Sequence, residues 1–164
     1  MQPNWYERHI LPTALDMACG MPMIGRMRQQ VVPRAQGRVL VVDLIGLSAE
    51  QIPLPDASFD TVLITYTLCT IPDPHAALLE MRRVLAPTGK LLYCEHGRAP
   101  DASVQRWQER LQPLWGKVAG GCHLGRDVPA LLQGAGFALP DLQTRYLTGP
   151  RPFTFHYWGE ALPA

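Results

Sequence analysis

The segment at positions 38–47 constrains the fold of this chain more than any other. It reads Arg-Val-Leu-Val-Val-Asp-Leu-Ile-Gly-Leu after Gly37, which is a β-branched and almost continuous apolar run. Such a run is typical of a strand that is buried on both faces of a parallel sheet. The segment therefore predicts a sheet whose two faces are both covered by other elements.

Further strands and a helix are expected downstream of this segment. Residues 61–67 and 90–94 form two more apolar runs of strand length. Between them, Asp73 and Pro74 predict the start of a helix, because aspartate caps a helix and proline suits its first position. The order of strand, strand, helix and strand predicts an α/β fold.

The C-terminal part of the chain predicts two helices and a hairpin. Residues 103–118 show an amphipathic helical pattern. Its predicted apolar face consists of Trp107, Leu111, Leu114 or alternatively Trp115, and Val118. Asp127 is expected to cap the next helix. From Phe137 onward, apolar and polar residues alternate well enough to predict an antiparallel pair of strands.

Length and charge restrict the class of protein. The chain has 164 residues, which fits one domain, with a helical segment at 1–36 and an α/β core at 37–164. Its net charge is +1 and it has no basic run, so nucleic-acid binding is not expected. No stretch approaches the roughly 20 apolar residues of a membrane span.

The cysteines and the N-terminus predict a cytoplasmic protein. The four cysteines contain no CxxC pair, and the first ten residues do not resemble a secretory signal. Free thiols in a reducing compartment are therefore expected rather than a disulfide framework.

Several segments together carry a family resemblance. Residues 48–60 read Ser-Ala-Glu-Gln-Ile-Pro-Leu-Pro-Asp-Ala-Ser-Phe-Asp, and residues 83–92 read Arg-Val-Leu-Ala-Pro-Thr-Gly-Lys-Leu-Leu. With Glu95-His96 and the block Gly-Cys-His-Leu-Gly-Arg-Asp at 121–127, they resemble a class I S-adenosylmethionine-dependent methyltransferase. The branch that includes thiol S-methyltransferases is the most similar. The resemblance implies a Rossmann-like methyltransferase sheet, S-adenosylmethionine as cofactor, and a small-molecule acceptor.

One part of the family pattern is missing. The family binds its cofactor with an E/D-x-G-x-G-x-G turn after strand one and with an acidic residue after strand two. Here residues 38–47 run directly into residues 48–50, which match the end of strand three. Two βαβ crossovers need about 50 residues or more, so there is no room for them. We therefore expect a truncated sheet in which strands one and three are fused and the first cofactor-binding βαβ units are absent.

This truncation leaves two functions open and predicts a homodimer. The chain is either a methyltransferase for a small acceptor, possibly a thiol by resemblance, or a catalytically inactive methyltransferase-derived protein that works through binding. Loss of outer strands exposes a sheet edge, which is a template for pairing. A second copy of the chain, with exchanged elements, is expected to cover it.

The resemblance assigns cofactor and substrate residues to the ends of the strands. Ser48, Ala49 and Glu50 match the position at which the family reads the adenine. Thr65 and Tyr66 follow the second predicted strand and are expected to face the cofactor. The predicted substrate residues are Thr67, Cys69, Trp107, Cys122, His123 and Arg126. Of these, Arg126 is expected to hold an anionic group.

Glu95 and His96 are the predicted catalytic residues. They follow the third strand, where His96 can act as a general base near neutral pH and Glu95 can orient it. A thiol acceptor must be deprotonated before it attacks the methyl group, since the thiolate is the nucleophile.

A zinc site is a weaker alternative for the same region. Its four ligands would be Cys94, His96, Cys122 and His123. Their spacing matches no common zinc motif, and Cys94 is expected to point into the core. No metal site is therefore predicted.

Overall fold

The N-terminal segment is helical, as expected. The structure is a computed structural model that describes residues 5–42 and 48–164. It begins with α1 (Trp5–His9), α2 (Leu11–Cys19) and α3 (Pro22–Arg28), followed by the short 3-10 turn η1 (Val32–Arg34). Pro22 begins α3, where its missing N–H costs nothing.

A five-stranded mixed sheet forms the centre of the molecule and confirms the α/β prediction. β1 (Val39–Val42), β2 (Phe59–Thr65) and β3 (Leu85–His96) are parallel. The C-terminal strands β4 (Phe137–Tyr146) and β5 (Phe155–Pro163) form the expected antiparallel pair. The strand order is β1-β2-β3-β5-β4, so β5 lies between β3 and β4.

Two of the remaining helices start at the predicted caps. α4 (Pro74–Val84) begins at Asp73, whose side chain accepts hydrogen bonds from two backbone N–H groups. α6 (Val128–Gly134) is capped by Asp127, whose side chain accepts a hydrogen bond from the N–H of Ala130. α5 (Ala102–Val118) and the short α7 (Arg151–Thr154) complete the described helices.

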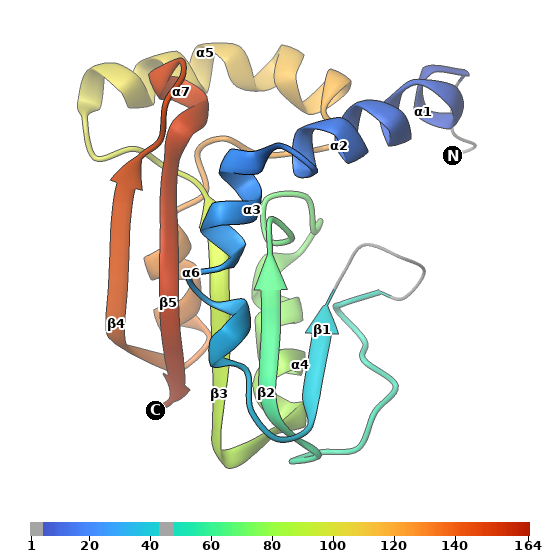
Figure 1. Ribbon diagram of the computed structural model, residues 1–164, viewed down its shortest axis with the longest axis vertical. Coiled ribbons are helices and arrows are strands. Elements are labelled where there is room, and N and C mark those ends of the chain that lie inside the picture. The colour runs from blue at the N-terminus through green and yellow to red at the C-terminus, as the bar shows by residue number, and fades with distance from the viewer. Residues whose placement is uncertain (1–4, 43–47) are drawn as a thin grey trace.

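Side-chain alternation along β2 and β3 builds a core on each face of the sheet. Ile64 and Tyr93 belong to the larger core, which α4 and α6 cover. Leu63 and Leu92 point to the opposite face and pack with Met27 of α3. In Figure 1, α3 crosses the front of the sheet while α4 and α6 lie behind it.

The strand β1 is less buried than predicted. Val39 and Val41 are 37% and 59% exposed, so the expectation of burial on both faces is wrong for the described part of this segment. The reason is that β1 is an edge strand of the described sheet, with β2 on one side. Residues 43–47, with Asp43 and Gly46, lie outside the described residues, and the fusion of two family strands stays a prediction.

The apolar face predicted for α5 is wrong at three positions, whereas Trp115, the alternative to Leu114, is half-buried and packs against Cys69, Ala119 and Cys122. Trp107, Leu114 and Val118 are 54%, 65% and 43% exposed. The buried residues are Val104 and Gln108. The helix is rotated from the expected orientation because the side-chain amide of Gln108 forms hydrogen bonds with four backbone groups inside the molecule.

No helix within residues 5–42 and 48–164 is long and apolar enough to cross a membrane.

Candidate functional site

Three segments that are far apart in sequence meet at the carboxyl end of the parallel strands. They are the loop that follows β2, the end of β3, and the loop between α5 and α6. Ligands of open α/β sheets bind at this end of the strands. In Figure 1, the arrowheads of β1 and β2 point to this end, and α1, α2 and α5 lie above it. The candidate site is therefore built at a position that the fold favours.

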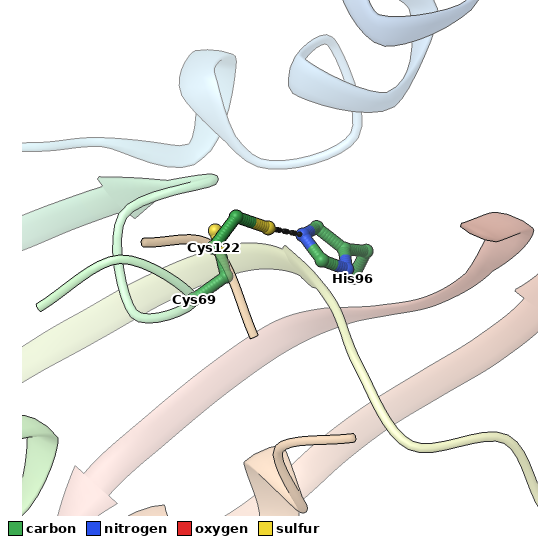
Figure 2. Close-up of side chains that lie close together, drawn as sticks. All are labelled: Cys69, His96 and Cys122. Atoms are coloured by element: carbon green, nitrogen blue, oxygen red, sulfur yellow. Dashed lines mark hydrogen bonds between the residues drawn. The ribbon is translucent and has the colours of Figure 1, made fainter. Parts of the chain in front are cut away.

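The centre of the site is a group of two thiols and one imidazole, which we call the Cys69–His96–Cys122 cluster. His96 Nε2 lies 3.1 Å from Cys122 Sγ, and the ligand atoms of all three residues lie within 4.8 Å of one another. Figure 2 shows the Cys122 sulfur directed at the His96 ring, with Cys69 beside it. Both cysteines are buried, with exposed fractions of 4% and 7%.

Cluster members change one another's pKa values. Hydrogen bonds to Cys69 and His96 lower the pKa of Cys122 to about 4, although burial opposes this shift. Burial lowers the pKa of His96, but the hydrogen bond to Cys122 and the charges of Cys122 and Glu95 together outweigh burial and raise the pKa overall. The hydrogen bond to Cys122 and burial both raise the pKa of Cys69. These directions favour a thiolate on Cys122 at neutral pH.

Glu95 holds the loop after β2 rather than the imidazole of His96. Its Oε1 accepts hydrogen bonds from the N–H groups of Thr67 and Leu68, at 2.8 and 3.2 Å. His96 Nε2 bonds to Cys122 instead, so the predicted orientation of His96 by Glu95 is replaced by a different pairing. Glu95 is fully buried, and burial raises its pKa to about 7.

Tyr66 lies over the ring of His96 in a strained backbone conformation. Its φ angle is 59°, in the left-handed region that non-glycine residues rarely adopt. Its ring is stacked with His96 at a centroid distance of 6.5 Å and meets His156 edge-on at 5.6 Å. Strain of this kind persists where the surroundings enforce it, and it is frequent at functional sites. The adjacent Thr65 accepts a hydrogen bond from Arg28 at 3.3 Å.

Two glutamines of α5 hold the site together, and the sequence analysis missed both. Gln108 binds the backbone of Ala99, Gly97, Leu124 and Pro152. Gln112 donates to the carbonyl of Cys122 and accepts from the N–H of Leu124. Their spacing of four residues places them on one helix face, which is the signal that could have identified them.

Arg126 and His123 take positions at the rim of the cluster. Arg126 donates through Nη1 to the carbonyl of Leu68 and through Nη2 to that of Ile71, the latter at 2.7 Å. Its predicted role in holding an anion stays a prediction. His123 is exposed, and its backbone N–H donates to the Cys69 carbonyl at 2.8 Å.

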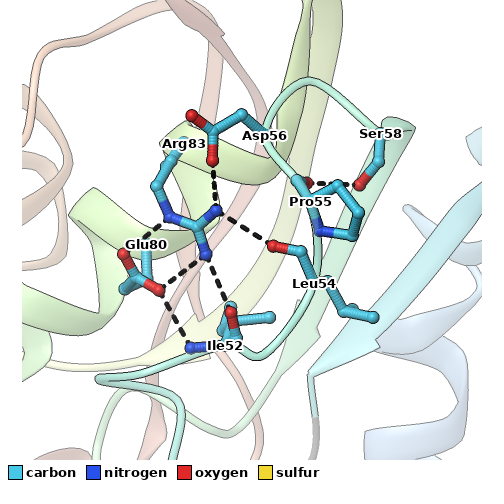
Figure 3. Close-up of polar contacts among 7 residues, drawn as sticks. All are labelled: Ile52, Leu54, Pro55, Asp56, Ser58, Glu80 and Arg83. Carbon is cyan, nitrogen blue, oxygen red and sulfur yellow. Dashed lines mark hydrogen bonds and ion pairs between the residues drawn. The ribbon is translucent and has the colours of Figure 1, made fainter.

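The segment of residues 48–58 is held against α4 by hydrogen bonds and ion pairs. Its first three residues, 48–50, are the predicted adenine contacts. Glu50 Oε1 accepts a hydrogen bond from the N–H of Asp73 at 2.8 Å, while Ser48 is exposed and Ala49 is half-buried. Figure 3 shows the polar contacts that hold the later part of this segment against α4. There Arg83 donates to the carbonyls of Ile52 and Leu54 and pairs with Glu80 and Asp56.

The structure does not bring every predicted residue into the cluster. Trp107 lies on the exposed side of α5 beneath the guanidinium of Arg110. Cys94 and His123 are not members of the described cluster either, because Cys94 packs in the core with Leu63 and Leu92. The four-ligand set considered from sequence is therefore wrong, and Cys69 joins His96 and Cys122 instead.

Comparisons with known proteins agree with this architecture. Residues 9–93 match the family model described as a methyltransferase domain. The thiol S-methyltransferase TMT1B of Rattus norvegicus is 35% identical over 115 residues, which cover 66% of this chain and 46% of that protein. A ubiquinone/menaquinone biosynthesis C-methyltransferase, UbiE of Methylobacterium nodulans, is 32% identical over 125 residues, or 74% of this chain and 47% of that protein.

A solved structure shows the same fold. The S-adenosylmethionine-dependent methyltransferase of Thermotoga maritima superimposes with a TM-score of 0.65 at 19% identity, over 97% of this chain and 98% of that one. The chain spans about half the length of the curated relatives it matches. The family model over more than half of the chain, the relatives and the shared fold establish that this chain belongs to the class I S-adenosylmethionine-dependent methyltransferase family.

Proposed function

We propose that this chain transfers a methyl group from S-adenosylmethionine to a small-molecule thiol. Family membership supports the reaction type. The similarity to thiol S-methyltransferases at 35% and 38% identity supports the acceptor class. The observation that carries the proposal is the 3.1 Å contact between His96 Nε2 and Cys122 Sγ, at the end of the sheet where this fold binds ligands.

The chemistry requires a thiolate at the site. When bound, S-adenosylmethionine supplies a methyl group on a sulfonium sulfur. The acceptor sulfur forms a bond to this methyl carbon as the carbon–sulfonium bond breaks, and the electron pair of that bond goes to the departing sulfur. The chain's own residues must position the two reactants and stabilise the acceptor as a thiolate. His96 remains the predicted catalytic residue for this step.

The described residues offer partners for the cofactor. Thr65 is the last residue of β2 and Tyr66 follows it, and residues 48–50 precede the loop that leads to β2. Hydroxyl and carboxylate groups of these residues suit the polar atoms of an adenosyl group. Five residues separate Val42 from Ser48, which leaves a shorter connection than the usual glycine turn and crossover need.

The remaining expectations form part of the proposal. A single domain over residues 1–164 is supported by the one five-stranded sheet that joins β1 to the C-terminal strands. A homodimer that covers the edge strand β1 is supported by the exposed valines of that strand. Cytoplasmic location is supported by the free thiols of Cys69, Cys94 and Cys122.

Calorimetric titration of the purified chain with S-adenosylmethionine tests this function. Saturable binding of one ligand per chain in the micromolar range is the expected result, and a screen of small thiols as methyl acceptors would follow. S-adenosylhomocysteine serves as a product control and is expected to bind at the same site. Absence of binding at millimolar ligand would refute the enzyme and favour the catalytically inactive, methyltransferase-derived binding protein.

A further inference from the structure

The Cys69–His96–Cys122 cluster has the composition of a metal site. Two cysteine sulfurs and one histidine nitrogen are soft or borderline ligands, which select zinc over magnesium or calcium. Three protein ligands of this kind with an open fourth position recur in catalytic zinc sites. The cluster comes from three separate segments, so its assembly depends on the fold and not on a local motif.

The distances in the cluster are close to those that zinc requires. Zinc binds sulfur at about 2.3 Å and nitrogen at about 2.0–2.1 Å, so ligand atoms around one tetrahedral ion lie roughly 3.5–3.8 Å apart. His96 Nε2 and Cys122 Sγ are 3.1 Å apart, and all three ligand atoms lie within 4.8 Å of one another. Adjustments of about 1 Å or less would bring the three atoms onto one ion.

The surroundings of the cluster provide a second, independent observation. Glu95 Oε2 is fully buried and has no hydrogen-bond partner among the described residues. A buried carboxylate oxygen without a partner is costly, and a nearby cation would reduce that cost. Glu95 interacts electrostatically with Cys69, His96 and Cys122, as does the guanidinium of Arg126. Two thiolates and one carboxylate are balanced in charge by one divalent cation and Arg126.

We propose that Cys69, His96 and Cys122 bind a zinc ion whose fourth position receives the sulfur of the acceptor thiol. The acceptor loses its proton to solvent when its sulfur coordinates the ion, because a coordinated thiol is deprotonated. The coordinated sulfur then attacks the methyl carbon, and the neutral thioether product leaves the ion because it is a weaker ligand. His96 acts as a ligand in this form, so no separate general base is needed. The role of the fourth position rests on the proposed function, whereas metal binding does not.

Cobalt substitution tests the site without any assay of activity. The purified chain is stripped with a chelator and titrated with Co²⁺ while absorption is recorded. One Co²⁺ per chain is expected, with visible bands of tetrahedral coordination and a near-ultraviolet band from thiolate-to-cobalt charge transfer. Stoichiometric Zn²⁺ should remove both signals. Absence of the charge-transfer band in the wild-type chain would overturn the proposal.

Matched variants locate the ligands. Cys69→Ser, Cys122→Ser and His96→Gln are each expected to weaken Co²⁺ binding at least tenfold. Cys94→Ser, a buried cysteine outside the cluster, and His123→Gln, a neighbour of Cys122, should bind as the wild type does. Equal binding by Cys69→Ser and wild type would contradict the assigned ligand set. Circular dichroism of each variant verifies that a loss of binding does not reflect unfolding.

A final pair of titrations separates this proposal from the proposed function. Adding a small thiol to the Co²⁺ form should intensify the charge-transfer band, because a third sulfur enters the coordination sphere. An unchanged band would refute the role of the fourth position. Calorimetry with S-adenosylmethionine on the metal-free chain tests cofactor binding alone, so either proposal can fail while the other stands.

Discussion

Gln112 fixes the position of Cys122 from the neighbouring helix. Its Nε2 donates to the Cys122 carbonyl at 3.0 Å, while its Oε1 accepts from the N–H of Leu124 at 2.7 Å. One side chain thus satisfies two backbone groups of the loop that carries Cys122. The geometry of the cluster depends on α5 even though α5 contributes no residue to it.

Gln112→Ala should therefore destabilise the chain and loosen the site. Loss of both hydrogen bonds leaves partly buried backbone groups unpaired, at a cost of about 1–3 kcal/mol in the free energy of unfolding. Urea denaturation measures this cost, and a thiol reagent should modify Cys122 faster than in the wild type. Gln133→Ala, on the exposed part of α6, is the control and should change neither quantity. Unaltered stability in Gln112→Ala would show that water replaces the amide.

Gly159→Ala should be strongly destabilising. Gly159 has a φ angle of 153°, and a Cβ atom there would lie 1.7 Å from the backbone oxygen of Asp141 on β4. Backbone atoms of paired strands cannot move apart cheaply, so a loss of about 3 kcal/mol or more is expected. Thermal unfolding measures it. Gly134→Ala, where a Cβ would meet nothing within 4 Å, should cost nothing or stabilise α6.

Glu80→Gln should flatten the acid dependence of stability. The hydrogen bond from Arg83, and then that from the N–H of Ile52, lower the pKa of Glu80 to about 2. Because the folded-state pKa lies below the unfolded value near 4.5, this contribution is present above about pH 4.5 and is lost as the pH falls towards 2. Denaturant midpoints measured across this window should fall less steeply in the variant. An identical slope would mean that the Arg83 contacts do not persist in solution.

His96→Gln should reduce methyl transfer without preventing cofactor binding. Loss of a group that handles the acceptor's proton or its thiolate typically lowers kcat by about 10²–10⁴-fold. The KM for S-adenosylmethionine should change little, because His96 is assigned to the acceptor. His75→Gln, an exposed histidine of α4, is the control. An active His96→Gln enzyme would exclude His96 from the reaction, whether as base or as ligand.

Local signals in the sequence predicted much of the scaffold. Asp73 and Asp127 marked two helix starts correctly because a cap acts on backbone groups two or three residues away. The pattern of α5 gave its length but not its orientation. Gln108 is buried because its four backbone partners come from three other segments, and none of them is visible in a helical pattern.

In the candidate site, too, some features could be predicted from local sequence patterns and others depended on tertiary contacts. The sequence by itself determined that His96 and Cys122 follow elements of an α/β sheet, and that family motifs surround them. Only the tertiary structure decided that Cys69 joins them and that Trp107 faces solvent, whereas the burial of Cys94 in the core was already predicted from the sequence. The physical reason is that the neighbours of a side chain within one helix or strand are set by the period of that element. The meeting of a strand end with two loops is set instead by how the strands are ordered and connected.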